Sequence, residues 1–127
     1  MATWKVRKFR RPNGECPVDD WLASSDVAPR DRTSVDSRVR VIEQIEKQLP
    51  HDWVVDYQGT SLQRLKLKAP GRKQIRFLCE KDEKKKTITL FNGMIKKSKS
   101  LPSGNISEAK KMQGEYRNGD GSVEDFG

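Results

Sequence analysis

The sequence predicts an α+β fold in which an antiparallel sheet carries an N-terminal helical hairpin on one face and is followed by a C-terminal helix. Several short segments alternate apolar and polar residues, which is the two-residue period of a strand. Apolar residues in the stretch 29–48 recur instead at spacings of three and four, which is the period of a helix. With 127 residues, we expect a single domain over 1–118 and a disordered acidic tail over 119–127.

The predicted strands are residues 3–10, 62–68, 73–80 and a run that begins at Thr87. The last run has apolar residues on both parities, so we expect it near the middle of the sheet, with its lysine-rich end at the rim of the core. Because the three later strands follow one another through short links, they are predicted to form an antiparallel meander.

Two predicted helices precede the meander. Pro17 begins a short one, because proline is favoured in the first turn of a helix. The second spans 29–48 and ends before Pro50; its apolar face consists of Val35, Val39, Ile42, Ile45 and Leu49. We expect 51–60 to be irregular.

The C-terminal helix is predicted to begin near Asn105. This residue and Glu108, three positions later, match a capping box, in which each side chain bonds the other's backbone N–H. Apolar residues at helical spacing follow: Ile106, Ala109, Met112 and Tyr116.

Positive charge is concentrated on the predicted meander. Residues 62–100 contain thirteen Lys/Arg and three Asp/Glu, whereas the whole chain has a net charge of +8. Because side chains alternate along a strand, several cations share the face opposite the leucines. These are Arg64, Lys66, Lys68 and Arg76. Lys96 and Lys97 join them at the end of the strand that begins at Thr87. Such a face can simply be solvated, but the acids that usually intersperse a solvated face are scarce, which favours an anion-binding surface.

Other classes of function are disfavoured by the composition. No apolar run approaches the ~20 residues of a membrane span, and the N-terminus lacks the apolar core of a signal peptide, so we expect a cytoplasmic protein without a membrane partner. Cys16 and Cys79 lie far apart and His51 is the single histidine. We therefore expect neither a metal nor a cofactor, and we expect reduced thiols.

The ordered set of segments resembles the RelE/HigB toxin superfamily, and within it the phage-derived, HigB-like host-toxicity branch. The resemblance covers nearly the whole chain, although no single motif is specific. It is carried by Leu65-Lys66, Ile75-Arg76-Phe77-Leu78-Cys79, Phe91-Asn92-Gly93-Met94-Ile95-Lys96-Lys97 and Ile106-Ser107-Glu108-Ala109. It implies a RelE-like microdomain whose sheet is covered by helices on one face and carries a basic site on the other.

The resemblance implies a toxin of a type II toxin–antitoxin pair, an endoribonuclease that cleaves mRNA, usually on the ribosome, and so inhibits translation. Its partner would be a separate antitoxin protein, HigA-like or another acidic or helix-turn-helix protein. Asn92 stands where the family often has histidine, Lys66 replaces a frequent arginine, and Ile75 and Cys79 replace frequent tyrosines. The alternative function is a non-catalytic basic module of the same fold that binds RNA or a protein, such as a phage protein acting on a host target.

RNA cleavage without metal requires a base for the 2′-hydroxyl, charge stabilisation at phosphorus and an acid for the 5′-oxygen. Arg76 is the predicted charge stabiliser, because a guanidinium can hold two phosphate oxygens. The alternative is that Arg76 forms a structural pair with Glu80. Lys66, Lys96 and Lys97 are the candidates for proton transfer, because crowded lysines lower one another's pKa. Further RNA contacts are expected from Arg64, Lys68, Lys73, Asn92 and Lys99.

Overall fold

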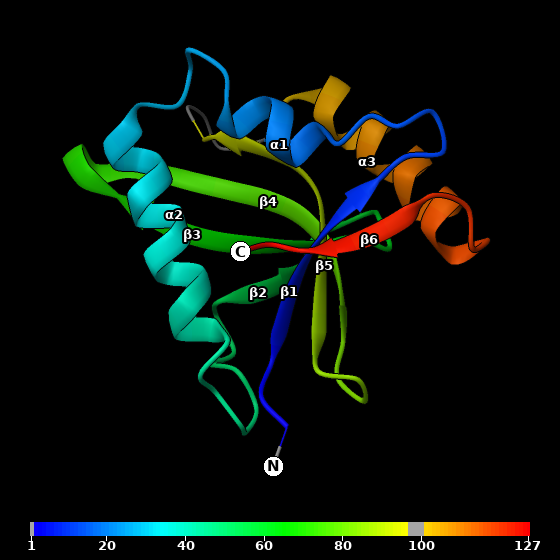
Figure 1. Ribbon diagram of the computed structural model, residues 1–127, viewed down its shortest axis with the longest axis horizontal. Coiled ribbons are helices and arrows are strands. Elements are labelled where there is room, and N and C mark those ends of the chain that lie inside the picture. Colours follow the sequence, from blue (N-terminus) through cyan, green and yellow to red (C-terminus); the bar gives the residue numbers. More distant parts are fainter. Residues whose placement is uncertain (1, 97–100) are drawn as a thin grey trace.

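The computed structural model describes residues 2–96 and 101–127 (Figure 1). The protein is α+β, as the sequence predicts. The elements in chain order are β1 (Lys5–Arg10), α1 (Pro17–Leu22), α2 (Pro29–Ile42), β2 (Val54–Asp56), β3 (Gln63–Ala69), a 3-10 turn (Pro70–Arg72), β4 (Lys73–Asp82), β5 (Thr87–Ile95), α3 (Ser103–Arg117) and β6 (Ser122–Asp125). The strands form one six-stranded sheet in the order β2-β3-β4-β5-β1-β6.

The three central strands β3, β4 and β5 form the predicted antiparallel meander. The sheet as a whole is mixed, however, because β1 lies parallel to β5, with Val6 opposite Ile88. Parallel neighbours need a long crossover between them, and here the intervening helices and meander supply it. The prediction of a wholly antiparallel sheet is therefore wrong at β1.

The sheet is covered on both faces. One core packs the apolar side of α2, which includes Val39 and Ile42, against β3 and β4 residues such as Leu65 and Phe77. A second core lies on the opposite face and includes Met112 of α3; the strand residues in it include Leu78, Phe91 and Met94. The face expected to be open is thus open only where α3 does not reach.

Helix α2 ends at Ile42, six residues before the predicted end. Beyond Ile42 the chain forms tighter turns, in which the Gln44 N–H donates to Val41 O at 3.2 Å and the Ile45 N–H donates to Ile42 O at 3.1 Å. The segment after the helix is also bound by the first strand. Ile45 O accepts a hydrogen bond of 3.0 Å from the Trp4 backbone N–H, and Lys47 O accepts one of 2.9 Å from Trp4 Nε1. At the other end of the chain, α3 begins at Ser103 with Pro102 at its cap, so the predicted capping box at Asn105 does not form.

Two short strands were missed by the sequence prediction. Val54–Asp56 was expected to be irregular but forms β2, which pairs with β3. The acidic tail was expected to be disordered, but Ser122–Asp125 forms β6, which pairs antiparallel with β1. The Arg10 Nε–Glu124 Oε1 ion pair of 2.6 Å links these two strands, and the Phe126 side chain is only 9% exposed. The folded unit therefore includes the tail.

An ion pair between a buried aspartate and a partly exposed lysine joins α2 to the start of β4. Asp31 is fully buried, and its Oδ2 lies 2.9 Å from Lys73 Nζ and 3.2 Å from the Ala28 backbone N–H. Lys73 was predicted to contact RNA, but its side chain leaves β4 on the α2 side of the sheet. Because it neutralises Asp31 there, it does not belong to the basic face.

Phe126 should anchor the C-terminal strand. We expect Phe126→Ala to lower the free energy of unfolding by about 3 kcal/mol, because it removes a largely buried aromatic side chain. Val123→Ala, at a position on β6 that is 37% exposed, is the control and should change stability by less than about 0.5 kcal/mol. Urea unfolding measures both values, and equal stability of Phe126→Ala and the parent would contradict the docked tail.

Protein stability should depend on the Asp31–Lys73 pair at acid pH. The hydrogen bond from Lys73 holds the pKa of the Asp31 carboxyl below its usual value. A carboxyl with a lowered folded-state pKa contributes stability above its unfolded pKa of about 3.9 and loses it as pH falls toward the folded value. The free energy of unfolding should therefore decrease as the pH falls below about 3.9 toward the folded-state pKa of Asp31.

The matched variant is Lys73→Met. It leaves a buried, unpaired carboxyl whose pKa is raised by desolvation, so acidification should now stabilise the protein at this site. Urea unfolding over a pH series compares the two proteins. Identical pH profiles for the parent and Lys73→Met would contradict the pairing.

Candidate nucleic-acid interface

The pairing of the meander brings four cations together. Lys66 on β3 lies directly opposite Arg76 on β4, and Arg64 shares their face. Lys96 follows β5, and its backbone N–H donates to Gln74 O at 2.7 Å. The charges of Arg76, Arg64 and Lys66 all act on the Lys96 ammonium. We call Arg64, Lys66, Arg76 and Lys96 the cationic cluster.

Arg76 is held in a fixed position within this cluster. Its side chain is only 7% exposed. Nη1 donates to Ile75 O at 2.9 Å, and Nη2 donates to Gln74 Oε1 at 2.9 Å. The buried Nε has no hydrogen-bond partner among the described residues. The guanidinium is therefore oriented by neutral groups and retains an unused donor.

No carboxylate of the described residues forms a salt bridge with Arg76. Glu80, the structural partner in the alternative interpretation, instead accepts from Arg117 Nε at 2.7 Å and from Gln113 Nε2 at 2.8 Å. The alternative in which Arg76 pairs with Glu80 is therefore wrong. Burial lowers the pKa of Arg76, and the nearby charge of Arg64 lowers it further. A guanidinium stays protonated in proteins, so Arg76 carries a nearly buried positive charge. Binding of an anion at this site would stabilise that charge.

The surroundings of Lys96 disfavour its charged form. Its pKa is lowered first by burial and then by the positive charges of Arg76, Arg64 and Lys66. Burial and like charges both disfavour the ammonium form. Among the lysines predicted to transfer a proton, Lys66 lies in the same cluster, whereas Lys97 lies outside the described residues, as does Lys99.

Two other predicted RNA contacts have different surroundings. Asn92 is 3% exposed, and its Nδ2 donates to Asn105 O in α3 at 2.9 Å, so it holds the start of that helix instead of facing solvent. Its buried Oδ1 has no partner among the described residues. Lys68 is exposed at the far end of β3, on the same face as Lys66. The structure thus removes Asn92 from the open basic surface and keeps Lys68 on it.

Two residues of the site were not predicted from the sequence. Gln74 orients Arg76, and its position two residues earlier on the same strand face was the available signal. Tyr57 was not among the predicted site residues, but the centroid of its ring lies 5.7 Å from the guanidinium carbon of Arg64. This distance is within the range of a cation–π contact, which holds Arg64 beside the cluster.

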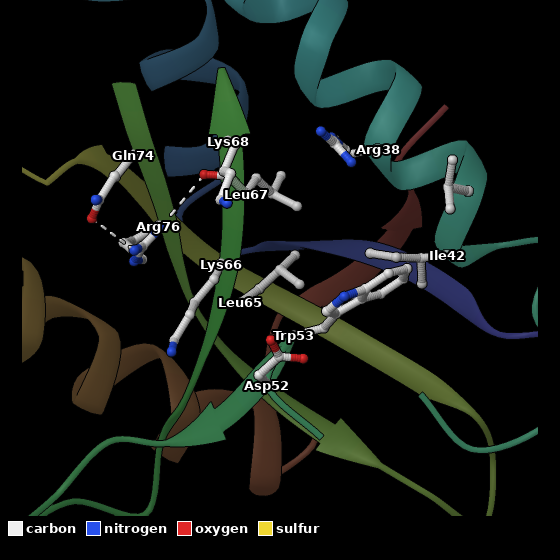
Figure 2. A pocket seen from close by; sticks show the side chains of 11 residues that line it. Arg38, Ile42, Asp52, Trp53, Leu65, Lys66, Leu67, Lys68, Gln74 and Arg76 are labelled. Atoms are coloured by element: carbon white, nitrogen blue, oxygen red, sulfur yellow. Dashed lines mark hydrogen bonds between the residues drawn. The ribbon is translucent and has the colours of Figure 1, made fainter. Parts of the chain in front are cut away.

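A cavity of about 480 Å³ adjoins the cluster. Its lining side chains lie on both sides of β3, as Figure 2 shows. Lys66, Gln74 and Arg76 are on the cationic side. Leu65, Leu67, Trp53 and residues of α2 line the apolar side. The cavity therefore extends around β3 at a place where the strand is not covered by β2.

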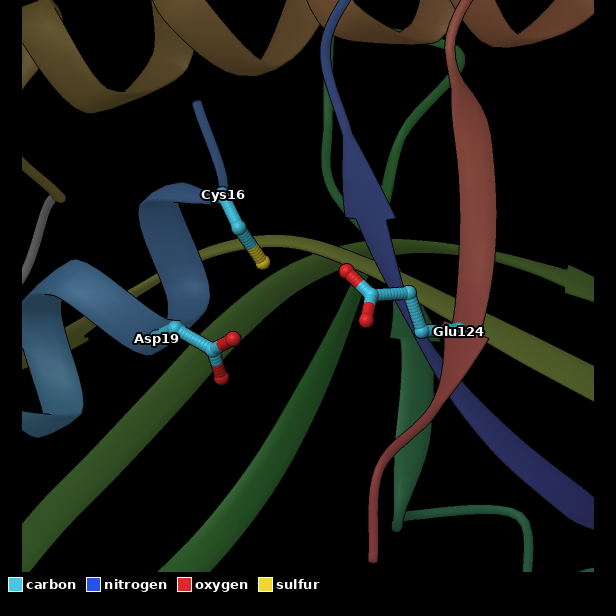
Figure 3. A group of neighbouring side chains, drawn as sticks. All are labelled: Cys16, Asp19 and Glu124. Carbon is cyan, nitrogen blue, oxygen red and sulfur yellow. The ribbon is translucent and has the colours of Figure 1, made fainter. Parts of the chain in front are cut away.

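Three side chains, shown in Figure 3, are close enough together to bind a metal ion, but the two carboxylates among them already form ion pairs with lysine and arginine side chains. Cys16, Asp19 and Glu124 offer donor atoms within 4.8 Å of one another. However, Asp19 accepts from Lys8 Nζ at 2.8 Å, and Glu124 accepts from Arg10 Nε at 2.6 Å. Burial also raises the pKa of the Cys16 thiol. We interpret this group as an ion-pair network that joins α1, β1 and β6.

Comparisons of the chain with protein-family models, with curated proteins and with solved structures find no match. Within residues 2–96 and 101–127, no helix has the length and apolar character needed to cross a membrane.

Single-stranded RNA should bind the cluster in a salt-dependent way, because phosphate contacts release counterions. Raising salt from about 50 to about 200 mM should weaken binding at least tenfold. Replacing Arg64 and Lys96 together by glutamine should reduce the slope of log K against log salt by about 1.4, or about 0.7 per contact.

The matched control replaces Arg32 and Lys84 by glutamine. It removes the same charge from exposed positions on α2 and on the β4–β5 turn, outside the cluster. Fluorescence anisotropy with a labelled oligonucleotide measures both slopes. Equal slopes for the two double variants, or a flat salt response of the parent, would contradict the interface.

Proposed function

We propose that this protein is a RelE/HigB-type toxin of a type II toxin–antitoxin pair, a metal-independent endoribonuclease that cleaves mRNA on the ribosome and so inhibits translation. The observation that carries the proposal is Arg76, a nearly buried guanidinium with an unused Nε and no carboxylate partner among the described residues. An RNA phosphate supplies the missing negative charge. The α+β fold with its antiparallel meander and helical hairpin is compatible with a RelE-like microdomain.

The cluster can perform each part of the cleavage step. Lys96, with its lowered pKa, takes the proton of the 2′-hydroxyl. The 2′-oxygen then attacks phosphorus while the bond to the 5′-oxygen breaks, and Arg76 stabilises the charge that develops on the phosphoryl oxygens. Lys66 donates a proton to the departing 5′-oxygen. The products are a 2′,3′-cyclic phosphate and a 5′-hydroxyl, and Lys68 contacts a flanking phosphate.

A second candidate function is a non-catalytic module of the same fold that binds RNA or a host protein. Asn92 favours it, because this residue replaces the frequent family histidine and an amide cannot exchange a proton at neutral pH. Its burial beneath α3 also keeps it away from a bound phosphate. Under this alternative, the cationic cluster holds RNA without cutting it.

Arg76→Ala should abolish the activity and leave the fold intact. The rate of mRNA cleavage on purified ribosomes should fall by about a hundredfold or more, the usual loss on removing one transition-state donor. Arg76→Lys should restore little, because an ammonium cannot replace the bidentate guanidinium. Melting temperatures of both variants should stay near that of the parent, since no salt bridge is lost.

Arg32→Ala is the control, because it removes an exposed arginine of α2. It should cleave at the parental rate. A folded, fully active Arg76→Ala protein would contradict the assignment of the site. Salt-dependent RNA binding by the parent without any cleavage of ribosome-bound mRNA would favour the binding module.

A further inference from the structure

The cavity beside β3 is bounded by the segment that leads into β2. The Trp53 backbone N–H donates to Pro50 O at 3.1 Å, and Trp53 O accepts from the Lys66 N–H at 2.9 Å. The partly exposed Trp53 side chain also packs against the core between α2 and the sheet. Asp52 directly precedes it. The segment therefore presents an indole ring and a carboxylate to the cavity from a constrained backbone.

Apolar and cationic side chains share the lining of this cavity of about 480 Å³. Its volume lies within the roughly 300–1,000 Å³ of small-molecule sites. Leu65 and Leu67 supply apolar surface beside the indole ring. Three of the lining cations are Arg38 of α2 and Lys66 and Lys68 of β3. A ligand that matches this lining combines an apolar surface with negative charge.

Asp52 is the single acid among the described residues that line the cavity. It is exposed, and the ion pairs between described residues do not include it. In the view of Figure 2, its carboxylate lies between Lys66 and the indole ring of Trp53. Because a carboxylate only accepts hydrogen bonds, it selects a ligand that presents N–H or O–H groups beside the indole.

We infer that the cavity binds a guanine nucleotide of single-stranded RNA, with the base stacked on Trp53 and its N–H groups bound to Asp52. This binding mode rests on the proposed function, which supplies RNA as the ligand. Unpaired RNA bases are recognised by stacking on aromatic rings and by hydrogen bonds to their base-pairing edges. Lys66 belongs to both the cavity and the cationic cluster, so a chain bound at the cluster can place one base here.

Guanine fits this carboxylate better than the other bases do. It presents two adjacent donors, N1–H and the N2 amino group, which match the two oxygens of Asp52. Adenine and cytosine present an amino group beside an unprotonated ring nitrogen, and uracil presents one N–H between two carbonyl oxygens. Since these acceptor atoms repel a carboxylate, the three other bases gain at most one hydrogen bond there.

A labelled pentanucleotide of sequence UUGUU is the probe, with 2′-O-methyl groups that prevent its cleavage. Fluorescence anisotropy with the full chain measures its affinity. Replacing guanine by hypoxanthine, which lacks the N2 amino group, should weaken binding about tenfold, because a hydrogen bond to a charged acceptor is lost. Replacing guanine by adenine should weaken binding by about tenfold or more.

Asp52→Asn tests the base preference. The ratio of the UUGUU affinity to the UUAUU affinity should fall from about tenfold or more to less than about threefold. Asp56→Asn, at an exposed acid of β2 outside the cavity lining, is the matched control and should keep the parental ratio. Both variants lose one negative charge, so a purely electrostatic role of Asp52 would change the affinity for all sequences and leave the ratio unaltered.

Two variants of Trp53 test the stacking, and circular dichroism checks that both are folded. Trp53→Phe keeps an aromatic face and should change the UUGUU affinity by less than about threefold, whereas Trp53→Leu keeps only apolar bulk and should weaken binding about tenfold. Quenching of tryptophan fluorescence by UUGUU in the parent should be absent in Trp53→Phe, because Trp4 is only 2% exposed and Trp21 packs against Phe77.

Three results would overturn the inference. The first is equal affinity of the parent for the guanine and hypoxanthine probes. The second is an Asp52→Asn protein that keeps the parental ratio. The third is guanosine 3′-monophosphate that binds as tightly as UUGUU, which would assign the cavity to a free nucleotide. Guanine-selective binding without any cleavage of mRNA would uphold the cavity and contradict the proposed function, whereas mRNA cleavage by a protein that binds all probes equally would do the reverse.

Discussion

The register of β3, β4 and β5 is the constraint on which the rest of the structure depends. A one-residue slip of β4 would exchange its two faces, so that Ile75 and Phe77 would leave the α2 core and Arg76 would enter it. The register is secured by these apolar contacts and by Gly93 on β5. A Cβ at Gly93 would lie 2.6 Å from ring atoms of both Phe77 and Trp21, so only glycine allows α1 to approach this closely.

The same register accounts for the electrostatics of the site. It places Arg76 opposite Lys66, whereas the acid nearest to it on the same strand face, Glu80, is bound by Gln113 and Arg117 of α3. The sheet thus collects cations at one end of a face whose other end is apolar and covered by a helix. A cation in this position is costly without an anion, and among the described residues Arg76 finds only neutral acceptors.

The elements with a strong local period were predictable from the sequence. The alternation in β3 and β4 identified the meander, and its parity placed Arg76 and Lys66 on one face. The short strands β2 and β6 were not predictable in this way, because three or four residues form a strand only when a partner edge is available. The path of the chain after α2 was not predictable either, because Trp4, which is remote in sequence, donates to Ile45 O and Lys47 O.

The composition of the site was predictable only in part, for the same reason. Charge and parity selected Arg64, Lys66 and Arg76. Tertiary contacts with α2 and α3 decided that Lys73 and Asn92 are used internally. No local pattern distinguishes a lysine that pairs with a buried aspartate on a distant helix from one that faces solvent.

Mapping of mRNA 5′ ends by primer extension in cells, after induced expression, tests the central claim most directly. Expression of the parent protein should produce new 5′ ends within translated regions, and expression of Arg76→Ala at the same level should produce none. Growth arrest by the parent with intact mRNA would contradict it.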